Sequence, residues 1–179
     1  KTTIKWISIA AGVSLSTLEE KLDSTSVVRL MPNMAASIGK SVTAFAPYSE
    51  SDPSFIQDAK DIATSFGAVH EIGESLFGAF IGISGSGIAM MFSLFHNMAQ
   101  GAVYSGLNYQ QAISVICDTA ISGASLLKES KEHPSSLITK VCSPGGITIE
   151  MMKSLSDDAF DSSVMEAVIR GSNKSKELE

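Results

Sequence analysis

The pattern of apolar and polar positions changes once along the chain, near residue 73. Before that point, short runs rich in β-branched residues alternate with segments of helical spacing. The runs predict four strands, over Ile4–Ile9, Val27–Met31, Ser41–Ala46 and Ala68–Ile72. Helices are predicted from Leu15 to Leu22, with Ser14 as N-cap, and from Pro53 to Phe66. This alternation is typical of a parallel or mixed sheet with helices packed on it.

After Gly73 the strand-like runs stop, and apolar residues recur at helical spacing. Long helices are predicted over 86–105, 108–129 and 157–176, with shorter ones between them. Turn residues separate these segments at Gly106, His133-Pro134, Ser143–Gly146 and Ser156–Asp158. We therefore expect an α/β part, residues 1–73, followed by an all-α part, residues 74–179.

Composition and charge exclude several classes of protein. Hydrophobic residues make up 44% of the 179, enough for a sizeable core, so the chain is not intrinsically disordered. The formal net charge is −6 and the basic residues are scattered, which argues against nucleic acid as a partner. Two isolated cysteines, Cys117 and Cys142, and three widely spaced histidines predict neither a disulfide framework nor a metal site. A reducing, cytoplasmic location fits this pattern best.

The longest apolar stretch runs from Leu76 to Met91. Glycines interrupt it, and it falls short of the roughly 20 residues of a bilayer span, so we expect no membrane segment. Residues 1–10 lack the pattern of a signal peptide.

Two glycine-bearing segments are candidates for binding chemistry. Ser84–Gly87 precedes a long helix, and Ser143–Thr148 precedes an amphipathic one. Glycines at a helix start expose unpaired backbone N–H groups that favour a carboxylate or phosphate, and Thr148 adds a hydroxyl. As patterns alone, both are also those of ordinary turns between packed helices, and that explanation is the simpler one.

The order of several segments carries more information than any one of them. The set Ile9–Val13, Val28–Asn33, Ile83–Gly87, Glu132–Pro134 and Val141–Ile149 resembles the pyrroline-5-carboxylate reductase family. The resemblance continues to Ala167-Val168 and Glu177-Leu178, so it covers essentially the whole chain. It implies the end of a Rossmann-type domain over residues 1–73 and a helical domain over 74–179 that forms a homodimer or a higher homo-oligomer. The implied reaction is reduction of 1-pyrroline-5-carboxylate to proline with NADPH or NADH.

The resemblance also implies which residues form the site. On the cofactor side these are Ile9, Ala10, Ala11, Asn33 and Lys140. On the substrate side they are Glu74, Ser143, Gly145, Gly146, Ile147 and Thr148. The loop backbone would hold the substrate carboxylate, and the Thr148 hydroxyl would meet the ring nitrogen as the catalytic contact.

The chain also departs from the family pattern. It lacks the Gly-x-Gly-x-x-Ala turn after a strand on which the dinucleotide pyrophosphate lies, so we expect a truncated form of a longer reductase. At four positions the residue differs from the one that is usual in the family, namely Met34, Ile88, His96 and Gln100. They motivate an alternative, a non-catalytic dimerising paralogue that keeps the fold.

Overall fold

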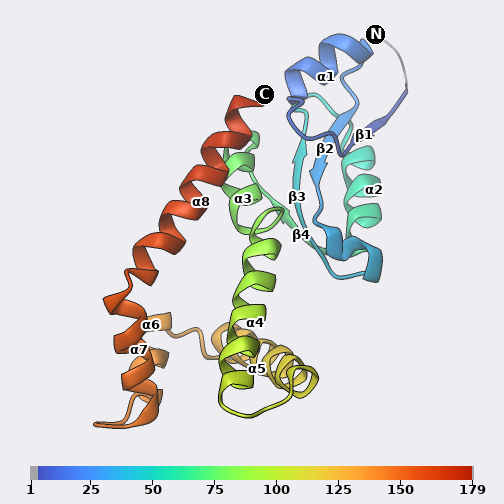
Figure 1. Cartoon of the computed structure of the whole chain (residues 1–179). Coiled ribbons are helices and arrows are strands. Elements are labelled where there is room, and N and C mark those ends of the chain that lie inside the picture. The colour runs from blue at the N-terminus through green and yellow to red at the C-terminus, as the bar shows by residue number, and fades with distance from the viewer. Residues whose placement is uncertain (1–3, 179) are drawn as a thin grey trace. The chain divides into compact units, whose positions relative to one another are not determined.

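The computed structural model describes residues 4–178, which form four strands followed by a mainly helical region (Figure 1). The strands are β1 (Trp6–Ser8), β2 (Val27–Met31), β3 (Ser41–Pro47) and β4 (Gly67–Glu71). The α-helices are α1 (Leu15–Leu22), α2 (Pro53–Thr64), α3 (Phe77–Ile83), α4 (Gly87–Tyr104), α5 (Tyr109–Ser130), α6 (Pro134–Val141), α7 (Ile147–Asp157) and α8 (Phe160–Glu177). Two short 3₁₀ helices, η1 (Met34–Ile38) and η2 (Glu74–Leu76), complete the set. The predicted fold class, α/β followed by all-α, is confirmed.

The chain divides into two compact units. The first runs to Ile88 and resumes at Met165, and the second is Ala89–Val164. The first unit is thus discontinuous in sequence, because its last helical segment comes from the far end of the chain. The domain boundary between residues 73 and 74 stays a prediction.

The sheet of the first unit has the order β1-β2-β3-β4 and is mixed. β1 pairs parallel with β2, and β3 pairs parallel with β4, while β2 and β3 are antiparallel. The helices α1 and α2 lie in the two parallel connections, as such crossovers require. Every residue of β2 is buried, so this strand is the centre of the unit.

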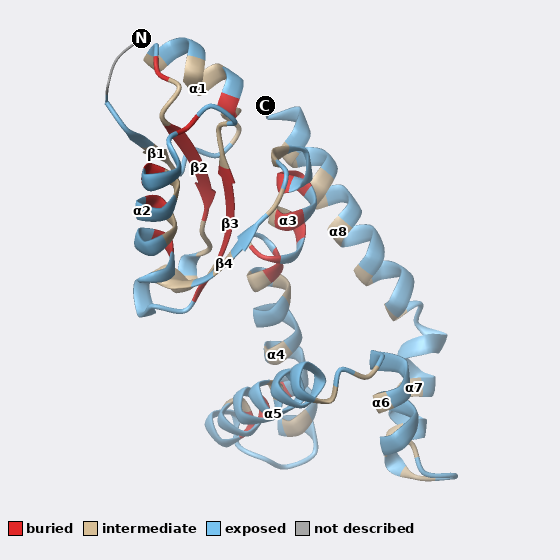
Figure 2. Ribbon diagram, turned by 180° about the vertical axis from the view of Figure 1, so that it is seen from behind, coloured by how far each residue is buried: buried red, intermediate tan, exposed pale blue. Residues whose placement is uncertain are grey.

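Two apolar clusters cover the two faces of the sheet (Figure 2). On one face, sheet residues such as Val27 and Ala44 pack against Leu15 of α1 and against Phe77 and Phe80 of α3. On the other, Val28, Leu30 and Phe45 pack against Phe55, Ala59 and Ala63 of α2. Burial of these side chains supplies most of the free energy that holds the unit together.

Side-chain caps fix where α1 and α2 begin. The Ser14 hydroxyl accepts a hydrogen bond from the Thr17 N–H, as predicted. At α2, the Asp52 carboxylate accepts hydrogen bonds from the Ser54 hydroxyl and from the N–H groups of Phe55 and Ser54. These bonds, that of the Ser54 hydroxyl first, hold the pKa of Asp52 below its ordinary value.

The last helical segment of the chain packs onto α3 of the first unit through glycines. A Cβ added at Gly78 would lie 3.0 Å from the Ser172 carbonyl oxygen, and one at Gly82 would lie 3.0 Å from that of Val168. The two helices therefore approach backbone to backbone. At the end of the same segment, the Leu178 carbonyl oxygen would be only 2.6 Å from a Cβ at Gly12, whose φ is +69°. Both the close approach and the left-handed backbone require glycine there.

The second unit has a small core and much exposed apolar surface. Ala99 of α4 packs against Ala112 and Ile116 of α5, with Phe95, Ala102 and Ile113 around them. Outside this cluster the helices leave large apolar side chains exposed, including Met91, Phe92, Val115, Ile121 and Met151 (Figure 2). An apolar surface of this extent is typical of a protein that buries it against a partner.

One helical run within residues 4–178, Glu74–Tyr104, is long and apolar enough to cross a membrane by length and composition. It is longer than the apolar stretch expected from the sequence. The run is broken between Ile83 and Gly87, where α3 ends and α4 begins. A core helix of a soluble protein has the same length and composition.

Candidate active site

The strand ends of β1 and β2 form the first part of the site. These neighbouring strands are parallel, so the residues that follow them meet at one edge of the sheet. Ile9, Ala10 and Ala11 follow β1 and are exposed, and Asn33 follows β2 after Pro32. Small exposed side chains at this edge leave the backbone accessible to a flat ligand group.

Asn33 is the centre of a polar network that joins two loops. Its Oδ1 accepts hydrogen bonds from the N–H groups of Ala35 and Val42, at 3.2 and 3.4 Å. Its Nδ2 lies 3.4 Å from the Ser84 hydroxyl, which in turn donates to the Val42 carbonyl oxygen at 2.9 Å. The network thus ties the loop after β2 to the Ser84–Gly87 turn, and Ser84 is buried in it.

Glu74, at the start of η2, is held by two donors from other elements. Its Oε1 accepts a hydrogen bond from the Leu15 N–H at 2.6 Å and one from Nη1 of Arg29 at 2.7 Å. The Arg29 side chain is fully buried, and its guanidinium carbon lies 4.8 Å from the centre of the Phe77 ring. A carboxylate beside a buried guanidinium compensates a charge that would otherwise be costly to bury.

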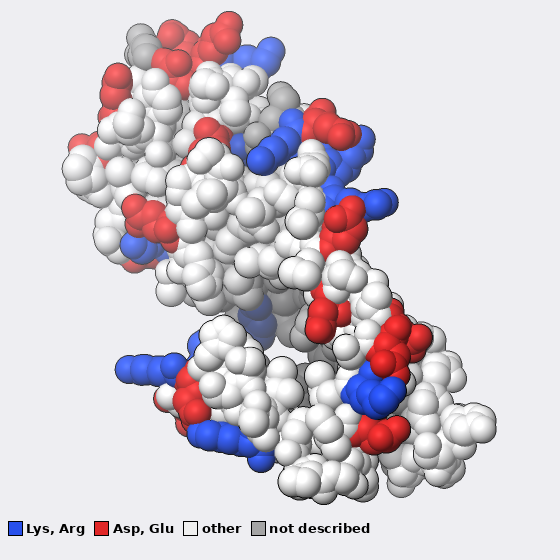
Figure 3. All heavy atoms as spheres, turned by 90° about the vertical axis from the view of Figure 1, so that its left-hand side faces the viewer, with Lys and Arg blue, Asp and Glu red and all other residues white. Residues whose placement is uncertain are grey.

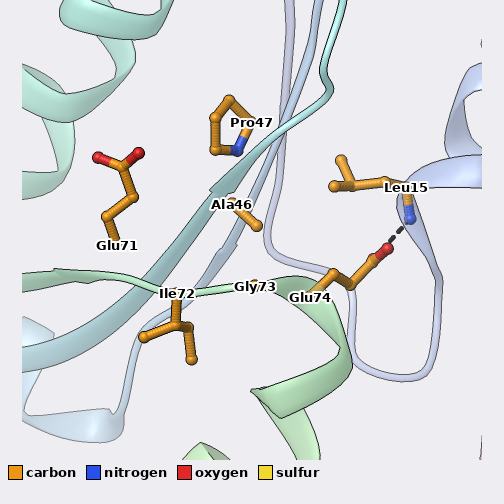
Figure 4. A pocket seen from close by; sticks show the side chains of 7 residues that line it. All are labelled: Leu15, Ala46, Pro47, Glu71, Ile72, Gly73 and Glu74. Carbon is orange, nitrogen blue, oxygen red and sulfur yellow. Dashed lines mark hydrogen bonds between the residues drawn. The ribbon is translucent and has the colours of Figure 1, made fainter.

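A pocket of about 480 Å³ opens beside Glu74 (Figure 4). Its lining comes from the start of α1, the end of β3 and the segment after β4, with residues Leu15, Ala46, Pro47, Glu71, Ile72, Gly73 and Glu74. Figure 4 shows the Glu74 carboxylate turned toward Leu15, away from Glu71. Glu71 instead pairs with Lys60 at 3.1 Å on the surface.

The Ser143–Thr148 loop lies in the second unit, at the start of α7. The Gly146 N–H donates to the Ser143 carbonyl oxygen at 3.0 Å, which closes a tight turn, and Gly145 has a left-handed φ of +65°. Gly146 is the N-cap of α7, and no side chain caps this helix start. The N–H groups of the first turn therefore have no side-chain acceptor from a capping residue, which is a condition for an anion site. Ile147 is 83% exposed, and Thr148 is half-buried.

Lys140 lies close to this loop in sequence, at the end of α6. Its ammonium donates to both carboxylate oxygens of Glu132, at 2.7 and 2.6 Å. Both residues are at the surface, so the pair itself contributes little to stability.

The predicted site residues therefore fall into two groups. Ile9, Ala10, Ala11, Asn33 and Glu74 lie in the first unit, whereas Lys140 and the Ser143–Thr148 loop lie in the second. Arg29 in the first group was not predicted, and Ser84 was predicted only as part of the candidate segment Ser84–Gly87. The available signal for Arg29 was a charged residue in the centre of an otherwise apolar strand.

Several charged side chains elsewhere form ion pairs at the surface. Lys153 pairs with Asp157, and Arg170 with Glu166. On the face drawn in Figure 3, Lys and Arg lie beside Asp and Glu, with wide uncharged areas between them. Among residues 4–178, no group of three or more His, Cys, Asp or Glu side chains could hold a metal ion.

Comparison with known proteins gives one consistent family. The family model for pyrroline-5-carboxylate reductase dimerisation matches residues 74–178. A pyrroline-5-carboxylate reductase of Methanosarcina acetivorans is 40% identical over 173 residues, which are 96% of this chain and 64% of the relative. One of Aquifex aeolicus is 38% identical over 96% of this chain and 65% of its own length. The chain thus spans slightly less than two thirds of these relatives.

Solved structures give the same result. The crystal structure of a pyrroline carboxylate reductase of Plasmodium falciparum with NADP bound matches with a TM-score of 0.90 and 28% identity, over 96% of this chain and 70% of that one. A pyrroline-5-carboxylate reductase of Coxiella burnetii matches with a TM-score of 0.90 and 28% identity, over 100% of this chain and 67% of that one.

Proposed function

Because this chain belongs to the pyrroline-5-carboxylate reductase family, we propose that the protein carrying it reduces 1-pyrroline-5-carboxylate to L-proline with NADPH or NADH. The single observation that carries the proposal is the relation to reductases over 96% of the chain, through both of its units. In the reaction, a hydride adds to the imine carbon and a proton to the ring nitrogen, and the nicotinamide is oxidised.

The residues at the edge of the sheet fit the nicotinamide end of such a cofactor. Ile9, Ala10 and Ala11 would lie against it, because exposed alanines at the end of a parallel strand permit close approach. Asn33 would keep the neighbouring loop in place through its bonds to Ala35 and Val42. When bound, the cofactor supplies the hydride. The NADP bound in the Plasmodium falciparum structure supports a nicotinamide dinucleotide as the cofactor.

The Ser143–Thr148 loop would hold the substrate. The N–H groups after Gly145 and Gly146, at a helix start without a side-chain cap, would bind the carboxylate of the anionic ring. Ile147 would contribute its backbone N–H, since its side chain is exposed. The Thr148 hydroxyl would hydrogen-bond the ring nitrogen and so orient the imine for hydride addition. Ser143 closes the turn that presents these groups.

Two further residues lie at the margins of the proposed site. Lys140, at the position that approaches the cofactor in the family, would remain anchored by Glu132. Glu74 lines the pocket, and the family resemblance implies that this residue is close to the substrate. An imine that is already protonated needs little general acid catalysis, so positioning and anion capture would carry most of the rate enhancement.

The protein would act as a homodimer or a larger homo-oligomer. The match to a dimerisation domain over residues 74–178 supports this, and so do the exposed apolar side chains of α4 and α5. A second copy would also cover the apolar surface of Glu74–Tyr104, without a membrane. We place the enzyme in the cytoplasm, with neither nucleic acid nor membrane as a partner.

A non-catalytic dimerising paralogue is the second candidate. The departures from the family pattern at Met34, Ile88, His96 and Gln100 favour it. The His96 side chain is engaged with Tyr109, whose hydroxyl lies 2.9 Å from Nδ1. The test is to purify the natural protein that contains these 179 residues and to follow NADPH absorbance with 1-pyrroline-5-carboxylate present. Substrate-dependent oxidation of NADPH supports the reductase. Dimerisation without turnover favours the paralogue.

A further inference from the structure

Arg29 places a positive charge inside the first unit, where no solvent reaches its side chain. It lies on the same face of β2 as Val27 and Met31, among the apolar residues that pack against α1 and α3. Its guanidinium lies over the Phe77 ring and donates to Glu74 at 2.7 Å. A buried guanidinium holds an adjacent carboxylate firmly, because separating the two would remove a hydrogen-bonded ion pair from a site that water does not reach.

The same carboxylate oxygen of Glu74 also holds the start of α1. It accepts the Leu15 N–H at 2.6 Å, and Leu15 is the first residue of that helix. The first N–H groups of a helix have no partner within the helix, and its dipole favours a negative charge there. Ser14 caps the Thr17 N–H, so Glu74 and Ser14 satisfy different donors of the same turn.

Three residues, Gly12, Val13 and Ser14, connect the exposed turn Ile9–Ala11 to the start of α1. That turn is fixed at one end by the pairing of β1 with β2, and at Gly12 it lies against the Leu178 carbonyl oxygen. Beyond these three residues the chain enters α1 at Leu15. The hydrogen bond from Leu15 to Glu74 therefore helps to hold the far end of this connection in place.

We infer that Glu74 is a positioning residue for the cofactor end of the site, acting through Leu15 and Arg29 on the turn Ile9–Ala11, and not a ligand of the substrate. The inference rests on the proposed function only for the identity of the ligand at the turn. It assigns Glu74 a role different from the substrate contact that the family resemblance implies. It also explains why a residue at the start of the dimerisation domain is bonded to the α/β part.

The test compares two double variants of the natural protein that contains this chain. Arg29→Met with Glu74→Gln removes both charges and keeps an oxygen that can accept the Leu15 N–H. Arg29→Met with Glu74→Ala removes the acceptor as well. Because neither leaves an isolated buried charge, both avoid the main cause of misfolding in a single Glu74→Ala variant. Glu71→Gln is the matched control, since Glu71 lines the same pocket but pairs with Lys60.

NADPH affinity is measured by fluorescence titration, and KM is measured for both substrates. We expect the Glu74→Ala double variant to bind NADPH about tenfold more weakly than the Glu74→Gln one, with the KM for 1-pyrroline-5-carboxylate equal in the two. The control should match wild type in both. Equal NADPH affinities of the two double variants would overturn the inference, and so would a difference confined to the KM for 1-pyrroline-5-carboxylate. If wild type binds NADPH but does not reduce 1-pyrroline-5-carboxylate, the proposed function fails while the affinity comparison still decides the role of Glu74.

Discussion

At the scale of single residues, Thr148 carries the most specific chemical expectation. Its side chain is half-buried. It is the second residue of α7, in the first turn, whose N–H groups no side chain caps. A threonine hydroxyl can both donate and accept a hydrogen bond, so it can stay bonded to the ring nitrogen whether or not the nitrogen carries a proton.

Thr148→Ala should therefore lower kcat/KM for 1-pyrroline-5-carboxylate and leave cofactor affinity nearly unchanged. The loss is that of one hydrogen bond to a charged group, roughly 1.5–3 kcal/mol or about ten- to a hundredfold. Steady-state kinetics of the active natural protein, with each substrate varied in turn, measure it. Thr139→Ala is the control, because its hydroxyl only bonds the Ser135 carbonyl within α6. If Thr148→Ala weakened NADPH binding and left the KM for 1-pyrroline-5-carboxylate unchanged, the loop would contact the cofactor rather than the substrate.

At the scale of elements, the cap of α2 links helix stability to pH. The Ser54 hydroxyl and the N–H groups of Phe55 and Ser54 stabilise the ionised Asp52, so its pKa is lower in the folded than in the unfolded chain. Its stabilising effect is complete above the ordinary pKa of 3.8 and is lost as the pH falls through the folded value.

Asp52→Asn should flatten the acid side of the stability profile. Asparagine caps a helix about as well as aspartate and does not titrate, so the two proteins should have similar urea midpoints near neutral pH. Below pH 3.8 the midpoint of wild type should fall more steeply than that of the variant. Asp58→Asn is the control, because the Asp58 carboxylate caps no helix in the described structure and only approaches Lys5. Parallel profiles for wild type and Asp52→Asn would refute the explanation.

Most elements could be predicted from the sequence, because their signals are local. The expected helix over 86–105 is α4, which is one residue shorter at each end, and the one over 108–129 is α5, shifted by one residue. The helix expected from residue 157 begins at Phe160 instead, since Ala159 has a left-handed φ of 55° that interrupts the pattern. The short η1 was not predicted, because it depends on the Asn33 cap rather than on apolar periodicity.

Strand direction and tertiary pairing were harder to predict. The sequence analysis left the sheet parallel or mixed, although residues 32–40 between β2 and β3 are too few for a parallel crossover. The Arg29–Glu74 pair could not be predicted, since its partners are 45 positions apart and belong to different segments of the pattern. The Ser143–Thr148 loop was recognised because its glycines and Thr148 are contiguous.

At the scale of the whole molecule, the exposed apolar side chains call for a second copy. Phe92 on α4 is 53% exposed and Ile121 on α5 is 66% exposed. Large apolar side chains exposed on both helices are typical of a surface that an oligomer buries.

Sedimentation of the 179-residue chain should give a dimer at micromolar concentration. Phe92→Glu together with Ile121→Glu should shift the equilibrium toward monomer, because each places a charge on a surface that association would bury. Gln57→Glu, at an exposed polar position of α2 in the first unit, should leave the dimer intact. A soluble, stable monomer of the unmodified chain would contradict the prediction.

Turnover by the 179 residues alone is not expected. The chain has a Gly-x-Gly sequence at Gly85-Ser86-Gly87. It lies between α3 and α4 rather than after a strand. It therefore does not provide the pyrophosphate turn of a Rossmann-type fold. A chimera with the N-terminal third of the Methanosarcina acetivorans relative placed before Lys1 should oxidise NADPH in the presence of 1-pyrroline-5-carboxylate, whereas the chain alone should not. Turnover by the chain alone would overturn the argument.

The discontinuity of the first unit also sets the order of events during synthesis. Residues up to Ile88 leave the ribosome before the second unit does, whereas the segment from Met165 that packs on Gly78 and Gly82 emerges after it. One side of α3 therefore stays uncovered while the whole second unit is translated. A chain arrested before Met165 should bind chaperones at α3, and release of the finished α8 should end that binding.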